Sequence, residues 1–341
     1  MPTAKRVIYY DIMKILACFT VIINHNGGLM ILNDPQRYQI IFYLAFFQFS
    51  KIGVPLFIMV SGALLLGRDD DPKRFYLKRI PRILLVLILF STYVFVAKNG
   101  ISPSLVPKYV KTLLAGPIIT PYWYLYMLVG LYLVTPFIQR MVRNFTETDY
   151  RSLFLISFLM VSTLPIVLYY LKISVTSQLS VNLFSGYVVY FIMGYYLKSR
   201  ETSKRVSLIA WITLISFILV SVILLMMEYD RAGELKMFLD SVYYITTVVP
   251  SISIFYLVKH YATSHEISEK SFKAIRIVSD TTFGIYLIHA LVQNRIRFIF
   301  NFFSTALDPV PSTVLFEVAL FVICFAIIFP LRKIPLVRQF L

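Results

Sequence analysis

Long apolar segments recur along the whole chain and constrain its fold more than any other feature. Crossing the ~30 Å hydrocarbon core of a bilayer takes about 20 apolar residues in a helix. The chain is 58% hydrophobic and only 15% charged, whereas soluble domains are about a quarter charged. We therefore expect an all-α integral membrane protein, a bundle of about ten transmembrane helices forming a single polytopic domain over residues 1–341. The expected spans are residues 8–31, 40–66, 80–97, 122–141, 152–171, 181–198, 206–227, 238–258, 277–299 and 313–331.

The basic residues indicate how this bundle is oriented. Most of the 33 Lys and Arg residues fall in alternate loops, on the same side as the N-terminus. Because cytoplasmic loops are enriched in Lys and Arg, both termini are predicted to be cytoplasmic. The net charge of +16 is scattered over these short loops, which argues against a nucleic-acid partner. The two cysteines lie in apolar segments and have no metal-ligand spacing, so no metal is expected.

Ionisable side chains interrupt the first apolar segment. Asp11, Lys14 and His25 lie within it, and because such groups are costly in a span they mark function by default. Lys14 and His25 are 11 residues apart, which on a helix places them within ~20° of one face and about 16 Å apart along the axis. A neutral imidazole can act as a general base, so His25 is the catalytic candidate and its neighbour Asn24 a candidate substrate contact. The alternative is a buried histidine that bonds a neighbouring helix.

Two arginines stand at the start of the third span. Arg79 and Arg82 are three residues apart and therefore share a helix face. Two guanidinium groups on one face can bind phosphate groups bidentately. The alternative is that they anchor the helix to anionic membrane lipids and set its topology.

Two further candidates lie near the opposite side of the membrane. Trp123 begins the fourth span among tyrosines, where an aromatic belt is expected, although sugars also stack on aromatic rings. His289 is the only other histidine within a span, and it is predicted either to contact the substrate or to make a packing hydrogen bond.

Three other positions lack an assigned chemical role. Asp280 is expected to pair with Lys14 or Arg79 near the cytoplasmic side. Glu317 lies in the outer half of the last span and has no evident partner. Pro55 interrupts the second span, and a proline there is expected to break the helix and help to line a cavity.

The order and spacing of several short motifs are similar to those of a known family. They are Asp11-Ile-Met-Lys14 through Asn24-His25, Gly53-Val-Pro-Leu-Phe through Ser61-Gly62, Lys78-Arg79-Ile-Pro-Arg82, Tyr122-Trp123-Tyr-Leu-Tyr, Leu131-Tyr132-Leu-Val-Thr-Pro136 and Thr281-Thr-Phe-Gly through His289. Together they resemble the membrane-bound acyltransferase-3 family of bacterial O-acyltransferases, over nearly the whole chain.

The resemblance implies a reaction. Members transfer an acyl group, usually acetyl, from cytoplasmic acyl-CoA to a hydroxyl of an extracytoplasmic glycan. The family's first-span motif is an arginine followed eleven residues later by the catalytic histidine; His25 matches, but Lys14 replaces the arginine and lacks its bidentate geometry. The resemblance assigns Arg79 and Arg82 to acyl-CoA binding. Some members carry a glutamate after the tryptophan motif, but residues 125–131 contain no acidic residue.

The same resemblance implies a location and partners. It implies a multi-pass protein of the bacterial cytoplasmic membrane, acting on an envelope glycan either alone or with a separate protein that delivers the acceptor. A different class of function also fits several spans with ionisable groups, namely a transporter or flippase of a lipid-linked glycan or small metabolite. Many transporters have internal repeats, and the sequence shows none.

Overall fold

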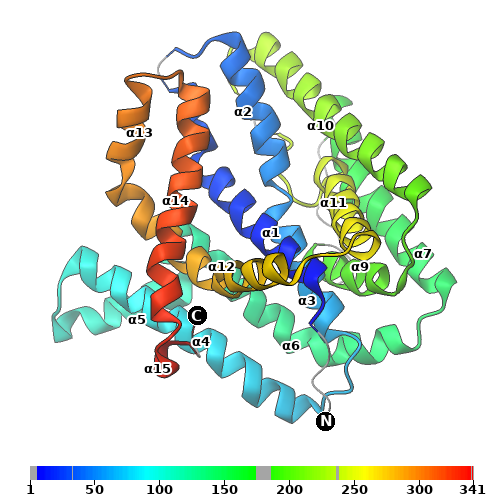
Figure 1. The fold of residues 1–341 in the computed structure, drawn as a ribbon, viewed down its shortest axis with the longest axis horizontal. Helices are drawn as coiled ribbons and strands as arrows, with labels where there is room; N and C mark the ends of the chain where they lie inside the picture. The colour runs from blue at the N-terminus through cyan, green and yellow to red at the C-terminus, as the bar shows by residue number, and fades with distance from the viewer. Residues whose placement is uncertain (1–5, 33, 174–185, 236–237, 339, 341) are drawn as a thin grey trace. The chain divides into compact units, whose positions relative to one another are not determined.

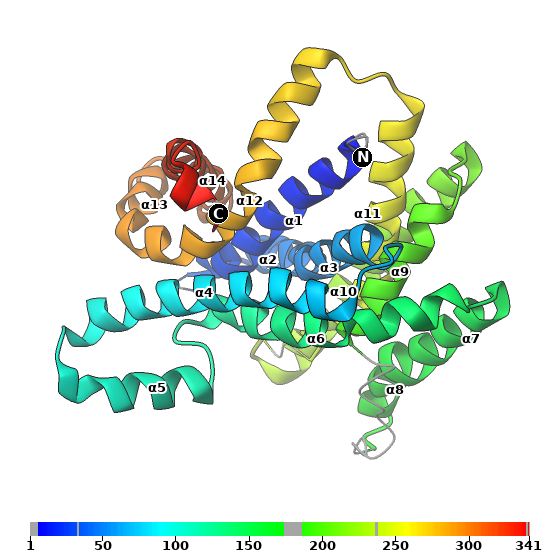
Figure 2. The same ribbon diagram turned by 90° about the horizontal axis from the view of Figure 1, so that it is seen from below.

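The computed structural model describes residues 6–32, 34–173, 186–235, 238–338 and 340, and no strand occurs within these ranges (Figures 1 and 2). The α-helices are α1 (Ile8–Asn26), α2 (Arg37–Ser50), α3 (Gly53–Leu65), α4 (Pro72–Asn99), α5 (Val106–Ala115), α6 (Trp123–Arg143), α7 (Glu147–Ser157), α8 (Leu164–Tyr170), α9 (Tyr187–Ser199), α10 (Lys204–Ala232), α11 (Ile245–Ser264), α12 (Glu269–Arg295), α13 (Arg297–Ser304), α14 (Pro309–Leu331) and α15 (Pro335–Arg338). A π-helix, Phe158–Thr163, joins α7 to α8.

In the described part of the chain, eight helical stretches are long and apolar enough to cross a membrane. They are Ile8–Ile31, Arg37–Leu65, Pro72–Asn99, Thr120–Arg143, Glu147–Tyr170, Lys204–Ala232, Glu269–Arg295 and Pro309–Leu331. Each overlaps one of the spans predicted from the sequence. The fold class, an all-α integral membrane protein, is therefore confirmed.

The other two predicted spans correspond to less apolar or shorter helices. The predicted span 181–198 begins outside the described residues, and α9 contributes 13 residues to it. The span 238–258 overlaps α11, which is 20 residues long but carries Thr246, Thr247, Ser251 and Ser253 among its buried positions. These hydroxyl side chains lower its mean hydropathy. The total of ten spans and the cytoplasmic location of both termini stay predictions.

The chain forms two compact units, the first comprising residues 1–64 and 145–329 and the second residues 65–144 and 330–341. Within the first unit, α1 packs along α12, and α10 packs against α11 and α2. Glycines allow the closest helix contact: a Cβ atom at Gly62 of α3 would lie 1.8 Å from the carbonyl oxygen of Phe191 in α9. Gly194 of α9 meets the backbone of Met59 in the same way. Small residues thus bring α3 and α9 into backbone contact, as in other membrane bundles.

The predicted second span forms as two helices, α2 and α3, with a break at Lys51 and Ile52. Pro55 has no N–H, so the carbonyl of Lys51 loses the donor that a continuous helix would supply. The break places the Lys51 side chain in the interior. There its ammonium group pairs with Asp240 and lies 4.0 Å from the centre of the Phe47 ring. The helix break expected from Pro55 is therefore present, and it carries a buried cation.

The second unit is built on α4 and α6, which pack against each other. Asp71 caps α4 by accepting a hydrogen bond from the backbone N–H of Arg74 at 2.8 Å, and Pro72 follows as the first helical residue. At the far end of α6, the Gln139 amide donates to the carbonyl of Leu65 at 2.9 Å. The cap fixes the start of α4, and the arginine pair follows about two turns further along this helix.

Candidate functional site

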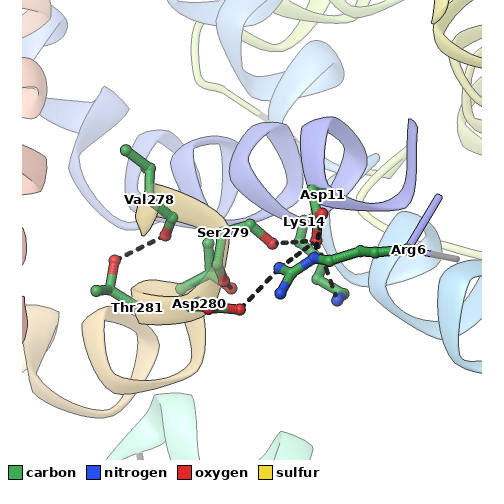
Figure 3. A network of polar contacts seen from close by, with 8 residues as sticks. Arg6, Asp11, Lys14, Val278, Ser279, Asp280 and Thr281 are labelled. Carbon is green, nitrogen blue, oxygen red and sulfur yellow. Dashed lines mark hydrogen bonds and ion pairs between the residues drawn. The ribbon is translucent and has the colours of Figure 1, made fainter. Parts of the chain in front are cut away.

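The N-terminal end of α1 is joined to α12 by a network of ion pairs and hydrogen bonds (Figure 3). Arg6 donates to both carboxylate oxygens of Asp11, at 2.6 and 2.8 Å, and to Asp280 of α12 at 2.7 Å. The Ser279 hydroxyl donates to Asp11 at 2.7 Å. The hydrogen bond to Asp11, followed by that to Asp280, raises the pKa of Arg6 above its ordinary value, so its guanidinium stays charged.

Lys14 lies at the edge of this network. Its ammonium nitrogen is 3.6 Å from Asp11, and its side chain is 31% exposed. Asp280 pairs with Arg6, and its carboxylate also interacts electrostatically with Lys14. The sequence predicted Lys14 or Arg79 as the partner of Asp280; the ion pair instead comes from Arg6, which precedes the apolar segment. The sequence does contain a feature that points to the role of Arg6. It is the pair of opposite charges formed by Arg6 and Asp11, which lie five residues apart where the first span begins.

The C-terminal end of α1 brings the two histidines of the spans together. The rings of His25 and His289 have centroids 5.2 Å apart and an interplanar angle of 37°. His289 is fully buried, and its Nδ1 lies 2.6 Å from the carbonyl oxygen of Tyr286, which requires that this nitrogen carry the proton. Its Nε2 therefore presents a lone pair, and this atom has no hydrogen-bond partner among the described residues.

His25 itself is only partly buried. Since α1 is a continuous helix from Ile8 to Asn26, the predicted relation of Lys14 and His25 along one face, about 16 Å apart, holds. A partly exposed imidazole beside a fully buried one is reachable by a ligand. The fixed partner, His289, supplies a neighbouring surface against which the His25 ring packs.

The break between α2 and α3 also borders this histidine pair. The Ser50 hydroxyl donates to the side-chain oxygen of Asn24 at 3.2 Å, which ties the end of α2 to the end of α1. Lys51 is close enough to His25 to interact with it electrostatically. Asn24 is exposed. The structure therefore gathers Asn24, His25 and His289 at one place and adds Lys51, which sequence reasoning had connected only with a helix break.

The predicted phosphate-binding arginines lie in the second unit. Arg79, half-buried, and Arg82 both interact electrostatically with the Tyr132 hydroxyl of α6. The ring of Phe75, one turn before Arg79, packs edge-on against Tyr132 at 5.9 Å between centroids. Both guanidinium groups thus share a face of α4, as the spacing predicted, and that face is positioned by α6.

Trp123 begins α6 in the same unit. Its indole is half-buried and meets the ring of Tyr124 edge-on, with centroids 6.2 Å apart. Nine residues separate it from Tyr132, about 13 Å along the helix. Trp123 and the arginine pair therefore occupy different parts of the second unit.

A comparison of the sequence with known protein families shows the family to which the chain belongs. A family model described as an acyltransferase domain matches residues 7–332, nearly the whole chain. The chain belongs to the acyltransferase-3 family. No curated protein and no solved structure matches it. Membership supports membrane acyl transfer rather than the transporter alternative.

As a multi-pass membrane acyltransferase, the protein has its Arg6–Asp11–Asp280 network and its histidine pair at opposite ends of α1. On α12, Asp280 and His289 are nine residues, about two and a half turns, apart. Within the described ranges, no group of three or more His, Cys, Asp or Glu side chains is placed to hold a metal ion. The chemistry available at the histidine end is acid–base and hydrogen-bonding chemistry.

Proposed function

We propose that this acyltransferase moves an acyl group, most simply acetyl, from cytoplasmic acyl-CoA to a hydroxyl of an extracytoplasmic glycan. The observation that carries the proposal is the partly exposed His25 packed beside His289, whose Nδ1 proton is committed to a backbone carbonyl. Family membership supplies the reaction class. A bacterial cytoplasmic membrane is the setting that this reaction requires.

On this proposal, three cations serve the donor. Arg79 and Arg82 share one helix face, which suits the phosphate groups of CoA. Lys14 shares a face of α1 with His25 and forms a long ion pair with Asp11, at 3.6 Å. Because Arg6 makes the short contacts to Asp11, Lys14 can turn toward an anionic ligand without leaving that carboxylate unpaired.

The chemical step is a direct transfer. Neutral His25 accepts the proton of the acceptor hydroxyl as its oxygen attacks the thioester carbonyl carbon. A C–O bond forms, the C–S bond breaks, and the proton on His25 passes to the departing CoA thiolate. His289 positions the His25 ring by packing. In a covalent variant of the step, His25 attacks first and carries the acyl group before the hydroxyl takes it.

The acceptor side is assigned to Trp123, Asn24 and His289. An exposed amide beside the catalytic histidine can hydrogen-bond a sugar hydroxyl, and an indole can stack on a sugar ring. The acceptor reaches the protein either unaided or through a separate delivering protein. Surrounding membrane lipid is the remaining partner.

A donor-binding assay tests the proposal at its first step. Purified protein in detergent should bind radiolabelled acetyl-CoA saturably and release CoA thiol only when envelope glycan is present. Arg79→Ala with Arg82→Ala should weaken donor binding, whereas Arg205→Ala, which removes an exposed cation from the start of α10, should leave it unchanged. Wild-type protein that binds no acyl-CoA would refute the proposal.

A further inference from the structure

A cavity of about 480 Å³ lies among three helical segments of the first unit. Its walls are formed by α7 with the π-helix that follows it, by α9 and by α11. Within this group, α7 packs on α9, and the π-helix packs on α11. Ligand pockets in proteins have volumes of about 300–1,000 Å³, so the cavity is large enough to hold a ligand.

The walls of the cavity are apolar. They include Phe154, Phe158, Val161, Met193, Val248 and Ile252. Ser162 and Tyr190 also line the cavity, but their hydroxyl groups bond within the protein, to the carbonyls of Ser157 and Val242. A ligand rich in polar groups would find few partners here and would lose its hydration, which is costly. The cavity therefore favours a hydrocarbon.

A widened helical turn forms part of the wall. The π-helix Phe158–Thr163 contributes Phe158, Val161 and Ser162 to the lining. Pro165, in the first turn of α8, has no N–H to donate to the carbonyl of Val161, as a continuous α-helix would require. Such π-helical turns occur frequently at functional sites. The irregular turn thus gives a reason, independent of volume, to regard this cavity as a binding site.

The cavity extends over about half the thickness of the hydrocarbon core. Ser162 lies eleven residues beyond Arg151, which also lines the cavity, and this is about 16 Å of the ~30 Å core. Both residues belong to the membrane-capable stretch Glu147–Tyr170, and only 17% of its apolar window is buried inside the protein. Leu155, another lining residue, is 59% exposed. The cavity therefore borders the lipid-facing surface of α7 over the depth of one leaflet.

An arginine stands at one end of the cavity. The side chain of Arg151 is 77% exposed, and its Nε donates to Glu147 at 3.2 Å. Among the described residues, this bond uses one of the five N–H donors of the guanidinium, so the others can bind a phosphate group. Arg200 binds the same carboxylate, so two guanidinium groups share one negative charge. Asp149, the next acidic residue of α7, accepts hydrogen bonds from Thr146 as part of the helix cap.

We propose that this cavity binds one acyl chain of an anionic membrane phospholipid, with the phosphate group of that lipid bound by Arg151. The apolar walls suit a hydrocarbon chain, and the depth of one leaflet matches a lipid tail. Arg151 lies where the stretch enters the membrane, which is the level of the lipid phosphates. Neither His25 nor His289 lines the cavity, so the inference does not depend on the proposed transfer reaction.

The experiment measures lipid binding to the purified protein in detergent. Radiolabelled phosphatidylglycerol is titrated, and unlabelled phosphatidylcholine with the same chains or glycerol phosphate is added as competitor. We expect saturable binding of phosphatidylglycerol. Phosphatidylcholine should compete about fivefold less well, because a basic residue near the membrane surface is worth about 1 kcal/mol toward an anionic lipid. Glycerol phosphate lacks the acyl chains and should not compete.

A first pair of variants tests the cavity. Val161→Trp fills the cavity from the π-helix wall and should abolish saturable binding. Val220→Trp introduces the same change at an exposed position of α10 that does not line the cavity, and it should bind lipid like the wild type. Melting temperatures check that each variant is folded. If Val161→Trp does not fold, Val189→Phe fills the cavity from the α9 wall instead.

A second pair of variants tests the head-group contact. Arg151→Gln should weaken phosphatidylglycerol binding about fivefold and remove the preference over phosphatidylcholine. Arg37→Gln is the matched control, because Arg37 is also an exposed arginine paired with a carboxylate, that of Asp230, at the start of a membrane-capable stretch. It should leave both affinities unchanged.

Saturable binding that persists in a folded cavity-filling variant would overturn the inference, and so would equal affinities of the wild type for the two lipids. An equal loss of binding in Val220→Trp would show lipid bound to the general surface and would also contradict it. Saturable binding of palmitoyl-CoA without binding of phosphatidylglycerol would assign the cavity to an acyl donor instead. The comparison of the two lipids in the wild type stands even if no cavity-filling variant folds.

Discussion

Both ends of α1 bring polar side chains against α12, but the hydrogen bonding of these side chains differs between the two ends. At the N-terminal end, the Asp11 carboxylate receives two hydrogen bonds from Arg6 and one from Ser279 (Figure 3). At the other end, the described structure leaves His289 Nε2 without a partner. Saturated polar groups hold helices together, whereas unsatisfied ones await a ligand. On the proposed function, the first end is structural and the second takes part in the chemistry.

This contrast has a consequence for mutagenesis. Changes to His25 should alter activity with little loss of stability. Changes to Arg6, Asp11 or Asp280 should alter stability, and activity only through it.

The largest expected effect is that of His25→Ala. Removing a general base lowers the rate by about 10²- to 10⁴-fold, and the melting temperature should stay near that of the wild type because His25 is only partly buried. Transfer of radiolabelled acetyl to envelope glycan measures the rate. His265→Ala, at an exposed histidine beyond α11, is the control and should be fully active. Full activity in His25→Ala would exclude both the direct and the covalent step.

Asp11→Ala should have the next largest effect, and it should act on stability. Among the described residues, it leaves the Arg6 guanidinium paired with Asp280 and removes the ion pair of Lys14 with Asp11. Breaking a buried pair from one side costs about 3 kcal/mol, a large part of the stability of a single domain. Thermal unfolding in detergent measures the loss.

Asp280→Ala is the matched comparison for Asp11→Ala. Its side chain is 35% exposed, against 2% for Asp11, so its loss should cost less. If Asp11→Ala melts like the wild type, the assignment of this end to structure is wrong.

The arginine pair should give a smaller effect, confined to the donor. Arg79→Ala with Arg82→Ala should raise the KM for acetyl-CoA about 10- to 100-fold, because hydrogen bonds between charged groups are each worth about 1.5–3 kcal/mol. The KM for glycan should not change. Arg79→Lys keeps the charge but not the planar fork and should be intermediate. An effect on the glycan KM alone would assign this face of α4 to the acceptor.

The smallest effect, a small loss of stability, is expected for a substitution of Asp308, which directly precedes α14. Hydrogen bonds from the hydroxyl of Tyr38 and the backbone N–H of Val310 hold the pKa of this carboxyl below its usual value. A carboxyl whose pKa is lower in the folded state than in the unfolded state stabilises the protein when the pH is above the unfolded-state pKa, near 3.9. This stabilisation is lost as the pH falls through the folded-state pKa. Because Asp308 is close to solvent, Asp308→Asn should cost only about 0.5 kcal/mol at pH 7.

The matching measurement is a melting curve at each pH from 7 to 3. The difference between wild type and Asp308→Asn should shrink toward the acidic end. A difference that grows in acid would mean that the sign of the pKa shift is wrong.

Much of the architecture follows from local patterns in the sequence. Hydropathy alone locates the eight membrane-capable stretches, because each needs about 20 apolar residues in succession. The relation of Lys14 to His25 and that of Arg79 to Arg82 follow from helical periodicity, which is local. The helix break before Gly53 follows from the missing N–H of Pro55.

The partners of these residues depended on contacts between distant segments. The sequence offered two partners for Asp280, and the described helices pair it with Arg6, 274 positions away. Nothing local indicates that His289 packs on His25, that Lys51 approaches His25, or that Glu317 is buried. Periodicity fixes which face of a helix a residue occupies, whereas the helix that covers this face is chosen by packing across the whole chain. For this protein, the sequence by itself determined the membrane helices and their polar faces, and only the tertiary structure decided which polar groups are paired and which remain open to a ligand.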